Sequence, residues 1–370
     1  MSEWQECQLG EIAEIQTGPF GSQLKNEQYI TGGTPIVTVE HISNFRINNF
    51  SYPSVTDEDK NRLSRYLLNE GDIIFTRVGS VDLSAFVKPH QQGWMFSSRM
   101  LRVRPETKID ARFLSYFFQQ KPFRDYVLSI AVGATMPSIN TEILKSIPIS
   151  YPELSVQKAI AAVLSSLDDK IDLLHRQNKT LETMADTLFR QGFVKEAGDW
   201  EEGTLGDVVE LVYGKALKED LRTGSGYPVV GSNGIVGHHA EYLVEGPGIV
   251  IGRKGTLGKV TYLFRSFFPI DTTYYIKSKD NSLGMLYEYF LLKTLNFENS
   301  DSAVPGLNRD IALSEEIKIP PKNIITEFND ICASFFSKIM VNTNQIQTLQ
   351  TLRDALLPKL MSGEVRVDYV

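Results

Sequence analysis

The stretch from Glu153 to Gly192 constrains the fold more than any other part of the chain, because its apolar residues recur at alternating steps of three and four. This spacing keeps one side of an α-helix apolar over several turns and is typical of a coiled-coil seam. A helix of this length would be roughly 50–60 Å long, so another part of the protein must cover its seam. The predicted seam consists of Gln157, Ile160, Leu164, Leu167, Ile171, Leu174, Asn178, Leu181, Ala185 and Leu188.

A second heptad pattern near the end of the chain is the expected cover. Each seam contains one asparagine, and antiparallel helices with coinciding ends would bring Asn178 and Asn342 within one turn of each other. A hydrogen bond between these side chains would satisfy both amides and fix the register. The alternative is that both asparagines lie at a wet gap near partner subunits. The second seam consists of Phe328, Cys332, Phe335, Ile339, Asn342, Ile346, Leu349, Arg353, Leu356 and Leu360.

The two helices belong to an internal duplication. Residues 4–18 align with residues 200–214 without a gap, and the lead-in MPSINTEI at 136–143 matches VPGLNRDI at 304–311. Since strands, a helix and a last strand alternate with glycine-rich turns in each copy, the pattern predicts the α+β class. The predicted domains are two mixed domains, each followed by a long helix, with boundaries at 1–151, 152–196, 197–320 and 321–370.

Composition sets a few limits. The net charge is −7 and neither mixed domain is basic, which by itself argues mildly against nucleic acid as a partner. The two cysteines cannot form a disulfide framework and favour a reducing cytoplasm. Apolar runs fall short of the length that a membrane span needs, so no membrane partner is expected.

No catalytic or metal-binding motif is expected in this chain. The segment GRKGTLGK at 252–259 resembles a phosphate-binding loop, but its lysine is followed by valine instead of serine or threonine. Cysteine and histidine residues do not recur at metal-ligand spacing. His238 and His239 form an adjacent pair in a glycine-rich turn, where solvated histidines are more common than ligands.

Polar and basic residues in matching turns of the two copies are instead suited to binding a phosphate backbone or a base edge. The alternative is that GSNG at 231–234 is a simple turn and that both arginines brace their own domains. Asn140 and Asn308 stand at matching positions before the long helices, and a structural role is favoured for them. The candidate DNA-binding residues are Ser22, Gln23, Lys25, Arg77, Ser80, Ser232, Asn233, Arg253, Lys254 and Thr256.

The chain resembles, over its whole length, the specificity subunit of type I restriction–modification systems. The resemblance rests on the duplicated starts at Trp4 and Trp200, on residues 231–255, on the paired lead-ins and on the ending LRDALLPKLMSGEVRV. It implies two α/β target recognition domains that each read one half of a split site in double-stranded DNA. Two long helices would form an antiparallel coiled coil that separates these domains and docks modification subunits, two of them in our prediction.

The resemblance further implies that this chain has no catalytic residue. S-adenosylmethionine, ATP and Mg would be used by partner subunits, and restriction subunits would join through the complex. Rival readings are a half-site specificity protein, a coiled-coil scaffold with two ligand-binding heads that does not bind DNA, and an enzyme of unrecognised type. Outward-facing apolar residues on the two helices are predicted to bind partner helices. These residues are Val163, Leu173, Phe189, Phe336, Met340 and Leu357.

Overall fold

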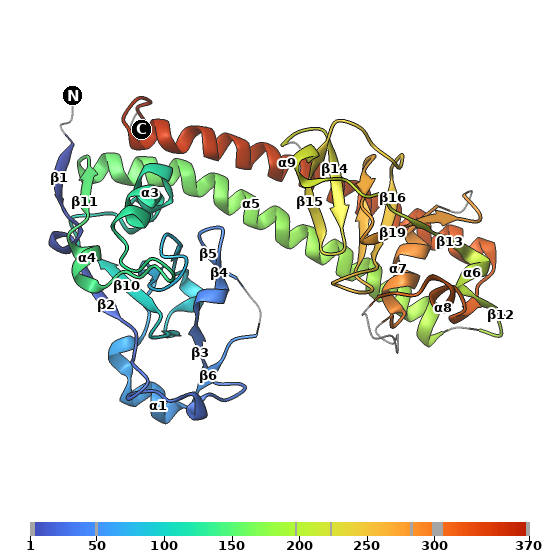
Figure 1. Cartoon of the computed structure of the whole chain (residues 1–370), viewed down its shortest axis with the longest axis horizontal. Coiled ribbons are helices and arrows are strands. Elements are labelled where there is room, and N and C mark those ends of the chain that lie inside the picture. The colour runs from blue at the N-terminus through green and yellow to red at the C-terminus, as the bar shows by residue number, and fades with distance from the viewer. Residues whose placement is uncertain are drawn as a thin grey trace. The chain divides into compact units, whose positions relative to one another are not determined.

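The computed structural model describes residues 4–48, 51–196, 198–222, 224–281, 284–297 and 306–367 (Figure 1). The chain divides into two compact units, Met1–Ile171 with Thr348–Val370 and Asp172–Gln347. Each unit contains one mixed domain and a part of each of the two long helices, α5 (Leu154–Phe189) and α9 (Lys322–Met361). A short π-helical segment, Arg190–Lys195, extends α5.

The two mixed domains are built around antiparallel four-stranded sheets with the same strand order, as duplication requires. In unit 1 the order is β2-β10-β7-β8, and in unit 2 it is β13-β19-β16-β17. The mixed helix and strand class predicted from the sequence is therefore confirmed. The strands are β2 (Ala13–Thr17), β7 (Ile73–Thr76), β8 (Ser84–Phe86) and β10 (Met100–Pro105), and β13 (Val209–Tyr213), β16 (Gly248–Gly252), β17 (Val260–Leu263) and β19 (Thr273–Ser278).

A two-stranded ladder in each domain ties its first strand to the strand that precedes a long helix. β1 (Gln5–Gln8) pairs with β11 (Pro148–Tyr151) in unit 1, and β12 (Glu201–Thr204) pairs with β20 (Glu316–Ile319) in unit 2. These antiparallel ladders hold the start of each domain next to the entry of its helix.

Smaller sheets carry the loops of each domain. The segment from 41 to 66 contains the β4–β5 ribbon, β6 and a short helix, because its apolar residues Ile42, Ile47 and Val55 are buried. The strands are β3 (Thr34–Val37), β4 (Ile42–Ser43), β5 (Arg46–Ile47), β6 (Ser54–Val55) and β9 (Met95–Phe96) in unit 1, and β14 (Tyr227–Gly231), β15 (Gly234–His239) and β18 (Phe268–Pro269) in unit 2.

Several of the short helices begin at a polar side chain that caps them. The Asn140 side chain accepts a hydrogen bond from the Ile143 amide, and Asn308 caps the matching helix in unit 2. Both asparagines therefore have the structural role that the sequence favoured. The short helices are α1 (Asp57–Arg62), α2 (Ala111–Gln119), α3 (Lys121–Ile130), α4 (Thr141–Lys145), α6 (Leu205–Val208), α7 (Leu286–Thr294) and α8 (Arg309–Leu313).

The long helices pack against each other within unit 2 in the antiparallel sense. Asn178 of α5 meets Asn342 of α9, and further along α5 the Phe189 ring lies 5.6 Å from the ring of Phe328. Residue numbers thus rise on one helix as they fall on the other. In unit 1, Asp168 of α5 forms an ion pair with Arg353 of α9.

The seam prediction is wrong at its last position. Leu188 is 42% exposed, whereas Phe189 is buried among the aromatic rings of unit 2, including Phe193 and Phe290. A straight α-helix advances 3.6 residues per turn and drifts away from a strict seven-residue repeat. After four heptads the buried side has therefore moved on by one residue.

Candidate nucleic-acid interface

The second domain brings two predicted loops together. Ser232 and Asn233 form the two-residue turn between β14 and β15, where Gly231 pairs with Gly234. Lys259 Nζ donates to the Asn233 carbonyl oxygen at 2.9 Å and to Asn233 Oδ1 at 3.1 Å. Asn233 itself is exposed, so this contact holds the turn against the loop after β16 and leaves one side of it open to solvent.

Arg253 stands in that neighbouring loop and is half-buried. Its guanidinium lies 4.9 Å from the ring centre of Tyr213 and 5.7 Å from that of Tyr274, and Nη1 donates to the Asp271 carbonyl at 3.0 Å. Burial raises the pKa of Tyr274 to about 12, with a smaller contribution from Tyr213. These contacts agree with the reading in which the arginine braces its own domain.

The neighbours of Arg253 have a different environment. Lys254 and Thr256 are exposed, and Gly255 between them has a φ of +81°, a conformation that favours glycine. The Lys254 amide donates to the Thr272 carbonyl at 3.1 Å, which fixes the backbone and leaves the ammonium group on an exposed side chain. Of the loop residues, Lys254 is therefore the best placed to meet a phosphate.

Arg77 in the first domain is the structural counterpart of Arg253. Its Nη1 donates to Thr17 Oγ1 at 3.3 Å, and its guanidinium lies 5.5 Å from the centre of the Phe20 ring. The backbone contacts are shared as well, because the carbonyl of Arg77 accepts from the amide of Ile139 at 3.0 Å and the carbonyl of Arg253 accepts from Leu307 at 2.9 Å. In each copy the lead-in to a long helix thus clamps the arginine turn.

The loop at residues 18–25 meets the Arg77 turn through Phe20, but its predicted DNA-binding residues differ in exposure. Gln23 is half-buried, and its Oε1 accepts a hydrogen bond from the Tyr66 hydroxyl at 2.7 Å. Ser22, Lys25 and Ser80 are exposed. Gln23 is therefore held by its own domain, whereas the other three can be reached from solvent.

Exposed apolar side chains that the sequence analysis did not select border both arginine turns. Phe20 is 49% exposed, and Met136 belongs to a loop that reaches the Arg77 turn, where the Gly79 amide donates to the Pro137 carbonyl at 2.8 Å. In unit 2, Ile235 follows the Ser232–Asn233 turn and is 58% exposed. Apolar residues beside polar turns are typical of contact surfaces, and their position within glycine-rich segments was the available signal.

Only some of the apolar residues predicted on the outer faces of the two long helices are exposed. Leu173 and Met340 are exposed, while Val163 and Leu357 are half-buried against the core of unit 1. Phe189 and Phe336 are buried in the core of unit 2, so their prediction as outward-facing residues is wrong. The aromatic rings of α7 and β17 pack on this side of the helices, and a two-helix pattern gives no sign of that third layer.

The seam residues fall into two groups. Apart from the exposed Leu188, the buried ones are Gln157, Ile160, Leu164, Ile171, Leu174, Ala185, Phe328, Cys332, Asn342, Ile346 and Leu360. The half-buried ones are Leu167, Asn178, Leu181, Phe335, Ile339, Leu349, Arg353 and Leu356.

The predicted hydrogen bond between the two seam asparagines is present. Asn342 Nδ2 donates to Asn178 Oδ1 at 2.9 Å, and a longer contact of 3.4 Å reaches Gln177 Oε1. Asn342 is fully buried, and its own Oδ1 has no hydrogen-bond partner. The side-chain amide of Asn342 therefore has a hydrogen-bond partner for its nitrogen but none for its oxygen.

The described residues contain no cluster of three or more histidine, cysteine, aspartate or glutamate side chains arranged to hold a metal ion. None of the helices in this part of the chain has a stretch that is both long and apolar enough to cross a bilayer.

A family model described as the type I restriction modification DNA specificity domain matches residues 1–183 and, a second time, residues 197–352. The chain therefore belongs to the family of type I restriction–modification specificity subunits. It is a DNA sequence-recognition subunit, and the members of this family are non-catalytic components of their complexes.

Two relatives are similar over nearly the whole chain. The MjaIX specificity subunit of Methanocaldococcus jannaschii is 25% identical over 414 residues, which cover 99% of this chain and 94% of the relative. The HindI specificity subunit of Haemophilus influenzae is 20% identical over 475 residues, covering 99% and 100%. The crystal structure of an S subunit from M. genitalium has the same fold, with a TM-score of 0.62 at 17% identity and coverage of 99% and 97%.

Proposed function

We propose that each mixed domain reads one part of a split site in double-stranded DNA. The observation that carries this proposal is the repetition of one sheet order with different turns around it. Arg77 and Arg253 are clamped in the same way in both copies, while the surrounding loops differ in sequence and length. Shared scaffolding with unlike reading surfaces is what an asymmetric, two-part target requires.

In this proposal the reading surface combines exposed polar residues with the apolar side chains beside them. Lys254, Lys25 and Ser80 would contact phosphates or base edges, and Phe20 or Met136 would contact bases or sugars. The two arginines would act mainly by holding the turns. The acidic balance of the chain is compatible with this role if modification subunits enclose the DNA jointly and supply part of the basic surface.

The long helices would space the two domains and dock the modification subunits, with two such subunits in the complex. Restriction subunits would join through them, and S-adenosylmethionine, ATP and Mg would serve those partners. The domain boundaries proposed for this division of labour are 1–151, 152–196, 197–320 and 321–370. Of the helix residues predicted to dock partners, Leu173 and Met340 are the exposed ones.

An exchange of one recognition domain tests the proposal. Residues 197–320 are replaced by the corresponding segment of another specificity subunit, and the chain is expressed with its modification subunits. One block of the methylated sequence should change while the other block stays as it was. A hybrid that changes both blocks would contradict the division of the site between the two domains. A hybrid that changes neither block, or a wild-type chain that never associates with a methyltransferase, would favour the scaffold alternative.

A further inference from the structure

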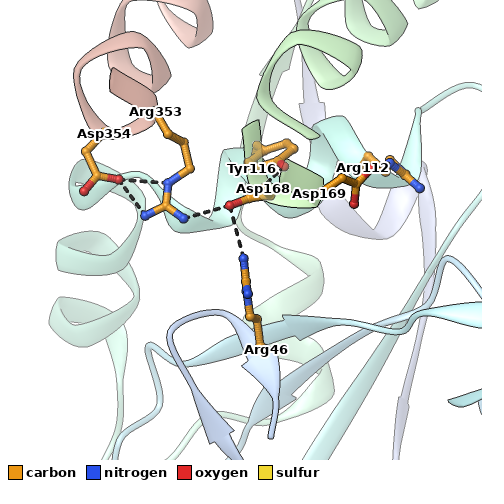
Figure 2. Close-up of polar contacts among 7 residues, drawn as sticks. All are labelled: Arg46, Arg112, Tyr116, Asp168, Asp169, Arg353 and Asp354. Carbon is orange, nitrogen blue, oxygen red and sulfur yellow. Dashed lines mark hydrogen bonds and ion pairs between the residues drawn. The ribbon is translucent and has the colours of Figure 1, made fainter. Parts of the chain in front are cut away.

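Three parts of unit 1 that are distant in sequence meet at one carboxylate on α5. Asp168 accepts a hydrogen bond from the Tyr116 hydroxyl at 2.7 Å and from Arg353 Nη1 at 2.8 Å, and Arg46 Nη2 lies at 3.4 Å (Figure 2). Tyr116 belongs to α2, Arg46 to β5 and Arg353 to α9. The carboxylate therefore joins the recognition domain of unit 1 to both long helices. We refer to these four residues as the Asp168 hub.

The hub is enclosed enough for its geometry to matter. Tyr116 is 5% exposed, and the side chains of Asp168 and Arg353 are 20% and 21% exposed. Burial raises the pKa of Tyr116 far above its ordinary value, and the neighbouring Asp168 charge raises it further, so the phenol stays a donor. Charge-assisted hydrogen bonds in such surroundings are directional and stronger than neutral ones.

The ribbon that supplies Arg46 is shaped for this contact. Its turn consists of Asn44 and Phe45, with φ values of 51° and 58°. A bulky residue such as phenylalanine is uncommon in the left-handed region and persists there only where the surrounding structure holds it. Arg124 lies 5.4 Å from the Phe45 ring and helps to hold the turn that places Arg46 next to α5.

Unit 2 has a matching arrangement at the matching tyrosine. Tyr289 aligns with Tyr116 in the internal repeat, and its hydroxyl donates to Glu182 of α5 at 2.7 Å. Lys293 Nζ donates to the same carboxylate at 2.8 Å. Each recognition domain thus offers a buried tyrosine hydroxyl to a carboxylate on α5.

The repeat alone does not explain this agreement. The repeat counterpart of Asp168 on α9 is Phe336, and the counterpart of Glu182 is Gln350, so neither carboxylate has a copy. Asp168 and Glu182 are two heptads apart and occupy the same heptad position of α5. The two copies therefore use different carboxylates of α5 for the same contact.

We infer that Asp168 is a positioning residue that fixes the recognition domain of unit 1 on the helices and thereby sets the spacer length that the protein accepts between half-sites. This inference rests on the proposed function. An apolar contact would permit small rotations of the domain, whereas three donors converging on one carboxylate define one orientation. The proposed reading surface does not include the hub, so the sequence that is read should not depend on these residues.

The test compares Asp168→Asn with Asp169→Asn in the complex with modification subunits. Asp169 is the adjacent carboxylate, 67% exposed and 3.8 Å from Arg112, and is a matched control. Binding is measured on duplexes that carry the methylated sequence with its natural spacer or with one base pair added or removed. Asp168→Asn should reduce the preference for the natural spacer by about tenfold or more, which corresponds to the loss of one charge-assisted hydrogen bond. Asp169→Asn should leave this preference unchanged.

Tyr116→Phe is the second variant, because it removes only the hydroxyl from a ring that stays in the core. It should also relax the spacer preference while half-site discrimination stays at the wild-type level. An unchanged spacer preference in both hub variants, or an equal loss of affinity for all spacers, would overturn the inference and leave the proposed function intact. A wild-type complex without sequence-specific binding would overturn both.

Discussion

The same substitution at the two seam asparagines is predicted to change the free energy of unfolding in opposite directions. Asn342 is fully buried and donates to Asn178 Oδ1 at 2.9 Å, but its own Oδ1 is unpaired. Asn178 is half-buried and can turn toward water. Replacement of Asn342 by leucine should therefore stabilise the chain, and replacement of Asn178 by leucine should destabilise it.

The magnitudes follow from the groups that each change removes. The unpaired buried oxygen of Asn342 destabilises the fold by about 1–3 kcal/mol, and Asn342→Leu removes this penalty. The leucine side chain that replaces it is buried, which stabilises the fold by about 1.5–3 kcal/mol. It loses one hydrogen bond of about 1 kcal/mol and adds some crowding, so the net gain in the free energy of unfolding should be about 2 kcal/mol. Asn178→Leu leaves the buried Asn342 amide with the long Gln177 contact alone and should cost about 1–3 kcal/mol.

The assay is urea unfolding of the isolated chain, followed by circular dichroism. Gln345→Leu, at an exposed position of the same helix, is the control and should change the free energy of unfolding by less than about 0.5 kcal/mol. The double leucine variant should be more stable than wild type but less strict in helix register. A destabilised Asn342→Leu together with a neutral Asn178→Leu would refute the reasoning.

Three further outcomes are expected. Lys254→Ala should weaken DNA binding by the assembled complex equally for all sequences and lower the salt slope by about 0.9, whereas Arg253→Ala should chiefly lower thermal stability; equal salt slopes in wild type and Lys254→Ala would exclude the phosphate contact. Burial raises the pKa of Glu288 to about 7, so its stabilising contribution, complete below about pH 4.5, is lost as pH rises to 7, and Glu288→Gln should be more stable than wild type by about 3 kcal/mol at pH 8 in thermal melts; equal melting curves would contradict this. Aspartate at both Leu173 and Met340 should abolish co-purification of modification subunits while the chain stays folded, and normal assembly would show that these residues are merely exposed.

The sequence predicted the features that depend on local periodicity or on repetition. Heptad spacing predicted both long helices, and an antiparallel arrangement with coinciding ends predicted the Asn178–Asn342 contact. Heptad spacing did not predict that Phe189 is buried in place of Leu188. The drift of the helix accumulates over several heptads, and a third layer of aromatic rings covers that end of α5. Exposure of the candidate site could be predicted only in part, since the burial of Gln23 depends on Tyr66, far away in sequence.

The Asp168 hub could not be predicted from local sequence patterns, because its residues also come from distant parts of the chain. Tyr116, Asp168 and Arg353 are dispersed over the chain, and each alone has the appearance of an ordinary residue on an amphipathic helix. Arg353 stands at a position of the predicted apolar seam and is half-buried there, with its charge matched by Asp168 and Asp354. Only the packing of the domain on the helices shows that these groups converge.

The most direct test of the central claim is a methylome of cells that express this chain with its modification subunits, compared with cells that lack the chain. Our account predicts methylation at two short, unlike sequence blocks separated by a gap of fixed length and unspecified sequence, with the blocks centred about 10 bp apart. It also predicts that this methylation disappears when the chain is absent. A single continuous motif, a perfect palindrome, or methylation that persists without the chain would contradict the account.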